Sequence, residues 1–196
     1  MSNTIKILAF AGSTRTDSIN KKLVAAAAEA VADPGASVTW IDLKDFVIPL
    51  YDGDIEAESG QPAAALTLRA LFKSHDALLI ASPEYNGFFS PLVKNTFDWL
   101  SRPLDGEERH AAFKSKPTLL LATTRGESGG GRGLQQLRQL LQNLKALPHE
   151  EVYLLPKGND AFDENGKLKS EQDQARLSGL VNEFIGQLRL RIVRAA

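Results

Sequence analysis

Short apolar runs alternate along the chain with longer segments that have a helical period. Five of these runs carry few or no charges, which is typical of strands buried on both faces of a parallel sheet. They predict strands at residues 5–11, 38–43, 77–81, 118–123 and 151–155, the last one at a sheet edge.

Between the runs, apolar residues recur three or four positions apart, as on one face of an α-helix. The first such segment carries Ile19, Leu23, Ala27 and Val31, and Pro34-Gly35 ends it. Helices are predicted at 19–31, 62–72, 91–100, 134–147 and 170–193, and the polar stretches 52–61 and 157–169 are predicted to be loops.

This strand-then-helix order predicts an α/β fold, with a doubly wound five-stranded parallel sheet and helices on both faces. We expect a single domain over residues 1–196, because no linker or repeat interrupts the pattern. Ligands of such sheets bind outside the carboxyl ends of the strands, so the loops after the first, third and fourth strands are the candidate site.

The loop after the first strand is rich in hydrogen-bond donors. It runs Gly12-Ser13-Thr14-Arg15-Thr16-Asp17-Ser18 into the start of a helix. Hydroxyls, an arginine and the positive end of a helix dipole are typical of a phosphate site. The alternative is an ordinary helix cap by Ser18 or Asp17.

The loop after the third strand reads Ser82-Pro83-Glu84-Tyr85-Asn86-Gly87. Tyr85 is suited to lie against a flat heterocycle, and Asn86 to hydrogen-bond its edge. The alternative is a rigid turn whose aromatic side chains pack into the core.

The loop after the fourth strand, residues 123–133, nearly matches a P-loop. Gly126 and Gly131 have the right spacing, but Arg132 and Gly133 replace the lysine and the magnesium-binding hydroxyl residue, which argues against an NTPase. The glycines either let the backbone approach a ligand closely or make the connection flexible.

Composition narrows the possible functions further. The 196 residues have a formal net charge of -1 and no cysteine. The near-neutral charge argues against a general nucleic-acid or anionic-membrane binder. The lack of cysteine excludes disulfides and thiolate chemistry and fits a reducing compartment, so we expect a cytoplasmic protein. His75, His110 and His149 show no metal-ligand spacing, and we predict no metal.

Together the motifs resemble the NADPH-dependent FMN reductase family, whose flavodoxin-like members include quinone and chromate reductases. The matching residues are Gly12, Ser13, Arg15, Ser18 and Asn20, the segment 82–87, the run Val93-Lys94-Asn95-Thr96-Phe97-Asp98-Trp99, and Gly126, Gly129, Gly130 and Arg132. Phe88 and Phe89 depart from the small residues usual at that point in the family, and Arg125 adds a cation near the expected flavin ring.

The resemblance implies FMN and NAD(P)H as cofactors and no catalytic side chain. The implied FMN-binding residues are Ser13, Arg15, Ser18, Ile19 and Asn20 around the phosphate, Pro83, Glu84, Tyr85, Asn86 and Gly87 beside the ring system, and Thr123, Thr124 and Gly126 on its other side. Arg102, Arg125 and Arg132 are candidates for the 2′-phosphate of NADPH.

The implied activity is hydride transfer from NAD(P)H through bound FMN to a quinone, a flavin or another small oxidant, in a ping-pong sequence. One alternative is a flavodoxin-type electron carrier, which the near-neutral charge disfavours. Another is an α/β phosphate-binding protein without flavin. The resemblance also implies a homodimer or homotetramer. We expect Phe88, Phe89, Phe97 and Trp99 to form an exposed aromatic surface at the subunit contact, and the alternative is that these residues are core of the single chain.

Overall fold

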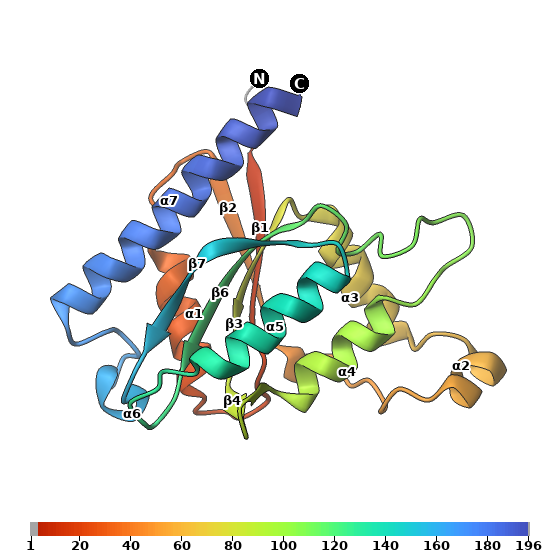
Figure 1. Ribbon diagram of the computed structural model, residues 1–196, viewed down its shortest axis with the longest axis horizontal. Coiled ribbons are helices and arrows are strands. Elements are labelled where there is room, and N and C mark those ends of the chain that lie inside the picture. The colour runs from red at the N-terminus through yellow and green to blue at the C-terminus, as the bar shows by residue number, and fades with distance from the viewer. Residues whose placement is uncertain (1–3, 196) are drawn as a thin grey trace.

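The computed structural model of the protein describes residues 4–195, in which five parallel strands form one sheet of order β2-β1-β3-β6-β7 (Figure 1). The strands are β1 (Ile5–Ala11), β2 (Ala36–Ile41), β3 (Ala77–Ala81), β6 (Pro117–Thr123) and β7 (Leu147–Leu155). Counted along the sheet, this order is that of flavodoxin-like folds. The predicted α/β, doubly wound, flavodoxin-like architecture is confirmed.

Helices cover both faces of the sheet (Figure 1). One layer holds α1 (Ile19–Glu29) and α7 (Glu171–Ala195), and the other holds α3 (Ala63–Ser74), α4 (Pro91–Leu100) and α5 (Gly131–Asn143). Because successive side chains of a strand point to opposite faces, Ile7 and Ala9 join the first core and Leu8 and Phe10 the second.

The core on the α3–α5 face contains aromatic side chains that we expected on the surface. Phe97 is 1% exposed and packs edge-on against Phe72 and Phe113, and Trp99 is fully buried. The indole nitrogen of Trp99 donates to the carbonyl of Pro49 at 2.8 Å. The predicted aromatic surface is therefore wrong for Phe97 and Trp99, because Phe97 packs into the aromatic core and Trp99 is covered by the segment before α2 (Gly53–Ser59), whose Tyr51 ring it contacts.

Several predicted element boundaries are also wrong. The segment 53–59 forms the helix α2 (Gly53–Ser59), capped by the side chain of Asp52, and 158–161 forms the short helix α6 (Gly158–Ala161). A 3₁₀ turn, η1 (Leu43–Asp45), follows β2. Helix α5 ends at Asn143 rather than at residue 147, and Lys145 then takes a left-handed φ of 66° before β7 begins.

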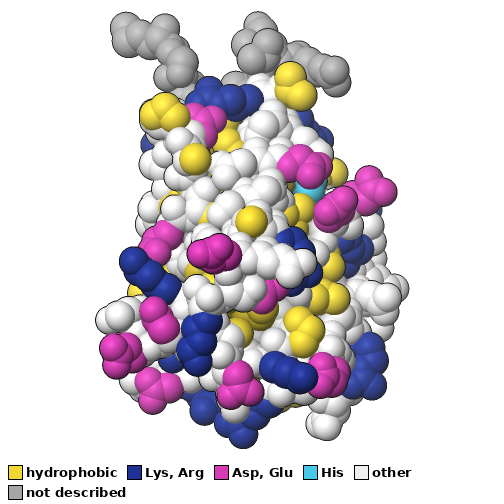
Figure 2. Space-filling view, turned by 90° about the vertical axis from the view of Figure 1, so that its left-hand side faces the viewer, with side chains coloured by type: hydrophobic (Ala, Val, Ile, Leu, Met, Phe, Trp, Pro, Cys, Tyr) yellow, Lys and Arg dark blue, Asp and Glu magenta, His cyan; other side chains and the backbone are white. Residues whose placement is uncertain are grey.

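The surface carries charges of both signs. On the side covered by α7, basic and acidic side chains are interspersed (Figure 2). No helix among residues 4–195 is both long and apolar enough to cross a membrane.

Candidate cofactor site

The three candidate loops meet around one cavity of about 230 Å³ at the carboxyl ends of β1, β3 and β6. Its lining consists of Ser13, Arg15, Ser18, Ile19, Asn20, Pro83, Glu84, Tyr85, Thr123, Thr124 and Arg125. Residues far apart in sequence converge here because parallel strands end at a common edge of the sheet. Of the predicted site residues, Asn86, Gly87 and Gly126 do not line the cavity.

The loop that follows β1 presents unused hydrogen-bond donors. Ser18 caps α1 by accepting from the amide of Lys21, and the buried Ser13 accepts from the amide of Arg15 at 3.3 Å. Within residues 4–195, the amides of Thr14, Thr16 and Asp17 have no acceptor, and the guanidinium of Arg15 makes no ion pair. Free amides, a cation and a helix N-terminus fit the phosphate of FMN.

Asn20 joins two walls of the cavity. Its amide nitrogen donates to the carbonyl of Thr123 at 3.0 Å, and its oxygen accepts from the amide of Thr123 at 3.1 Å. The hydroxyl of Thr123 in turn donates to the carbonyl of Leu155 at 2.7 Å. One N–H and the oxygen of the Asn20 amide thus hold the two loops together, and a contact of its second N–H with phosphate stays a prediction.

The segment after β3 folds into a tight hairpin of β4 (Glu84–Tyr85) and β5 (Phe88–Phe89). Asn86 and Gly87 form its two-residue turn with φ values of 53° and 82°. Asn-Gly between aromatic residues is the usual signal for this turn, and the sequence reasoning missed it. The turn carries Asn86 and Gly87 away from the cavity and leaves Tyr85 49% and Phe88 57% exposed.

Glu84 anchors this hairpin to the start of α5. Its carboxylate accepts from the amide of Gly133 and from the guanidinium of Arg132, both at 2.9 Å. A Cβ on Gly133 would lie only 3.2 Å from the Cβ of Glu84, and one on Gly130 only 2.8 Å from that of Ala122. These two glycines therefore allow close packing of the chain on itself, while nothing lies within 4 Å of the Cβ position of Gly126.

The arginines expected to meet NADPH differ in their partners. Arg132 is held by Glu84, and Arg102 donates to Glu56 at 2.8 Å. Arg125 is exposed at the cavity rim. On the neighbouring segment, a hydrogen bond to Glu127 raises the pKa of the exposed Lys157.

The fold and this cavity define an α/β protein with a donor-rich loop and a cavity at the carboxyl edge of its sheet. The chain belongs to the NADPH-dependent FMN reductase family, whose sequence model matches residues 5–160. The predicted enzyme class and cofactors are confirmed: the protein is an FMN-dependent NAD(P)H oxidoreductase of this family.

Individual relatives agree with this assignment. The chain is 35% identical over 197 residues to an NAD(P)H-dependent FMN reductase of Pseudomonas aeruginosa, which covers 99% of this chain and 98% of the relative. It is 34% identical over 148 residues to a quinone reductase of Escherichia coli, covering 75% and 74% of the two chains.

A solved structure shares the fold. The flavoenzyme NAD(P)H:(acceptor) oxidoreductase FerB of Paracoccus denitrificans superimposes with a TM-score of 0.79 at 24% identity, over 94% of this chain and 97% of that one.

Proposed function

We propose that FMN occupies the cavity between the loops after β1, β3 and β6, and that NAD(P)H and a quinone-type acceptor bind in turn at its open side. The observation that carries this proposal is that Arg15 and the α1 N-terminus line the same cavity as Tyr85. The loop that contributes Arg15 also carries the free amides of Thr14, Thr16 and Asp17. When bound, FMN supplies the hydride transfer.

The chain's own residues then bind and orient rather than exchange protons. Arg15 and the amides of its loop hold the phosphate. Pro83, Tyr85 and Thr124 border the ring system from two sides of the cavity. The carboxylate of Glu84 lines the cavity, but its two oxygens accept hydrogen bonds from the guanidinium of Arg132 and the amide of Gly133. We therefore assign it no role as an acid or base. A site without its own acid or base suits a reaction in which the cofactor carries the chemistry.

The hairpin favours a flat, apolar acceptor. Tyr85 and Phe88 expose aromatic rings on a two-residue turn that Glu84 fixes to α5. Rings held in this way offer stacking area at little cost in conformational entropy. A quinone combines a flat ring with the ability to accept hydride, and we propose this class of acceptor.

Steady-state kinetics test this assignment. Initial rates are measured with FMN-loaded protein while NADPH and a benzoquinone are varied together. If the two substrates share one open side, reciprocal plots at several quinone concentrations are parallel, and each substrate inhibits competitively against the other at high concentration. Intersecting lines would require both substrates to be bound at once and would contradict the shared site.

We also propose that the protein is a homo-oligomer. Val47 is 86% and Leu50 80% exposed on the irregular segment before α2, the segment that covers the buried Trp99. Exposed apolar side chains of this kind are typical of subunit contacts. Light scattering should give at least twice the mass of one chain, and Leu50→Glu should lower it. A single-chain mass at micromolar concentration would contradict this proposal.

A further inference from the structure

A second cavity, of about 440 Å³, lies between α1, the edge strand β2 and the turn 163–167. Its lining consists of Thr16, Lys21, Lys22, Ala25, Ala26, Glu29, Trp40, Asp42, Lys44, Glu164, Asn165, Gly166 and Lys167. Thr16 belongs to the loop whose Arg15 lines the cavity proposed for FMN, so the two cavities share one loop.

An accessible indole ring stands in the wall of this cavity. Trp40 lies near the end of β2, an edge strand that pairs only with β1, and is 46% exposed. The neighbouring α1 lines the cavity with the small side chains of Ala25 and Ala26 and with the long polar side chains of Lys21, Lys22 and Glu29. The ring of Trp40 is accessible to a planar group, and a nucleotide base stacks favourably on a ring of this kind.

The cavity is also rich in lysines. Lys21 is paired with Asp42, and this half-buried ion pair joins α1 to the end of β2. Within residues 4–195, the ammonium groups of Lys22, Lys44 and Lys167 make no ion pair. Four lysines outnumber the three carboxylates in the lining, so the cavity favours an anion.

The turn that carries Lys167 is held in one conformation. The carboxylate of Asp163 accepts from the amides of Asn165 at 2.9 Å and Lys167 at 2.8 Å, and Gly166 has a φ of 79°. A Cβ on Gly166 would lie 3.8 Å from the Cγ of Lys22, so the turn sits directly against α1. A wall that is ordered before binding lowers the entropic cost of holding a ligand.

From these features we propose that the cavity binds a phosphorylated adenosine, with the base against Trp40 and the phosphate among Lys22, Lys44 and Lys167. Glu29 and Glu164 provide acceptors for the ribose hydroxyls. The ligand is either the adenosine 2′-phosphate end of NADPH or a free nucleotide. Binding of NADPH rests on the proposed function. In that case the lysines of this cavity bind the 2′-phosphate, because Arg102 is already paired with Glu56 and Arg132 with Glu84.

Tryptophan fluorescence of the FMN-loaded protein tests this site without reference to catalysis. The chain has two tryptophans, and Trp99 is fully buried, so an exposed ligand reaches only Trp40. Titration with 2′,5′-ADP, 5′-AMP, adenosine and inorganic phosphate should give saturable quenching by the nucleotides, weaker at high salt. Trp40→Phe should abolish this quenching while calorimetry still detects residual binding.

Charge variants locate the phosphate. Lys22→Gln and Lys167→Gln should each weaken 2′,5′-ADP by about fivefold, the upper range for an exposed charge pair. Lys145→Gln, an exposed lysine at the other end of the sheet, is the matched control and should change nothing. Absence of saturable quenching, or equal affinity for 2′,5′-ADP in all three variants, would overturn the proposal. Inorganic phosphate that bound as tightly as the nucleotides would also overturn it.

The same variants distinguish the two sources. If the ligand is the end of NADPH, 2′,5′-ADP competes with NADPH, and Lys22→Gln raises KM for NADPH but not for NADH. If it is a free nucleotide, quenching occurs without competition. Protein that binds 2′,5′-ADP but oxidises no NADPH would refute the proposed function and leave the nucleotide site standing.

Discussion

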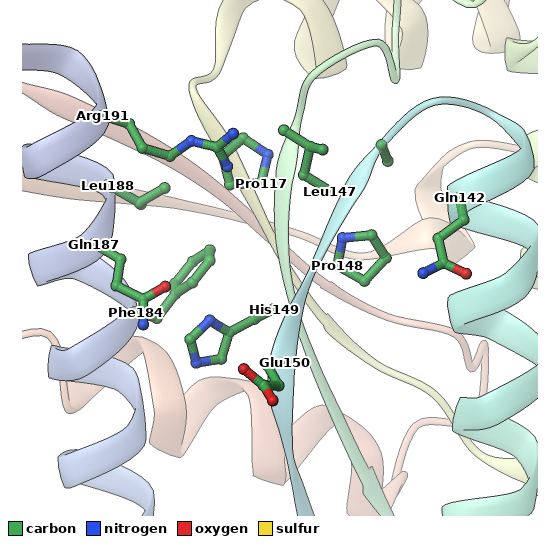
Figure 3. A pocket seen from close by; sticks show the side chains of 11 residues that line it. Pro117, Gln142, Leu147, Pro148, His149, Glu150, Phe184, Gln187, Leu188 and Arg191 are labelled. Carbon is green, nitrogen blue, oxygen red and sulfur yellow. The ribbon is translucent and has the colours of Figure 1, made fainter. Parts of the chain in front are cut away.

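The two ends of the sheet each carry a cavity, and they differ in chemistry more than in size. The cavity at the carboxyl edge, in which we propose that FMN binds and which we call the flavin cavity, has about 230 Å³, whereas the cavity at the amino edge, shown in Figure 3, has about 330 Å³. The larger cavity is lined by side chains of β7 and α7, among them His149 and Phe184. His149 is 8% exposed, and its ring packs edge-on against the ring of Phe184 with 5.5 Å between the ring centroids.

Helix direction explains the difference. In a parallel α/β sheet every strand leads into a helix N-terminus at the carboxyl edge, and helices return their C-termini to the amino edge. Thus α1 and α5 begin beside the flavin cavity, while Gln142, near the end of α5, lines the other one. The positive helix ends therefore lie at the carboxyl edge, and this edge favours binding of a phosphate group. Cavity volume alone favours the amino edge, whereas the helix ends favour the carboxyl edge for a phosphorylated ligand.

The largest expected effect concerns Asn20, which joins the loops of the flavin cavity. Asn20→Ala removes both hydrogen bonds to Thr123 and leaves two buried backbone groups unpaired, so the free energy of unfolding should fall by about 3 kcal/mol. FMN affinity should fall with it. Asn182→Ala, which removes bonds between α7 and α1, is the control: it should lower stability in urea unfolding but leave FMN affinity unchanged.

Arg15 should matter to FMN without supporting the fold. Arg15→Ala should weaken FMN by about 1–3 kcal/mol, the scale of a hydrogen bond to a charged group, with little change in stability. Arg191→Ala makes the corresponding change at the other cavity and should leave FMN affinity as it is. Equal FMN dissociation constants for both variants, measured by flavin fluorescence, would remove Arg15 from the site.

At the amino edge, we expect the buried imidazole of His149 to lower the free energy of unfolding. Its Nε2 is buried without a hydrogen-bond partner, and the nearest carboxylate oxygen, on Glu183, is 4.0 Å away. His149→Phe keeps an aromatic ring against Phe184 and removes the unpaired nitrogen. The free energy of unfolding should rise by about 1 kcal/mol, with FMN affinity unchanged. A less stable variant would show that the nitrogen has a role in the native protein.

The smallest effect is expected at Phe88, which lies opposite the cavity residue Tyr85 in the β4–β5 hairpin. Phe88 is exposed, whereas Phe89 is half-buried against the α3–α5 core, as the alternation of side chains along a strand predicts. Phe88→Ala should change the ratio of kcat/KM for a bulky and a small quinone by about fivefold or less. Phe89→Ala should instead lower stability. If Phe88→Ala left the ratio unchanged, the exposed ring would have no part in acceptor choice.

The sequence by itself determined the sheet, the helices on its two faces and the three loops of the site. Hydrophobic period is a local property, and the order of strands and helices leaves few topologies open. The donor-rich loop from Gly12 to Asn20 was visible for the same reason, since its residues are neighbours in the chain and α1 starts beside them.

The tertiary structure alone decided what each side chain does there. Asn20 is 103 positions from Thr123, and Glu84 is 49 from Gly133, so neither partner is readable from local pattern. The same holds for two aromatic residues of α4: Phe97 is buried against α3, and Trp99 against the segment before α2. The lysine cavity likewise needs α1, β2 and the turn 163–167 together. Local sequence sets backbone conformation, but partners and burial depend on segments that only the complete fold brings into contact.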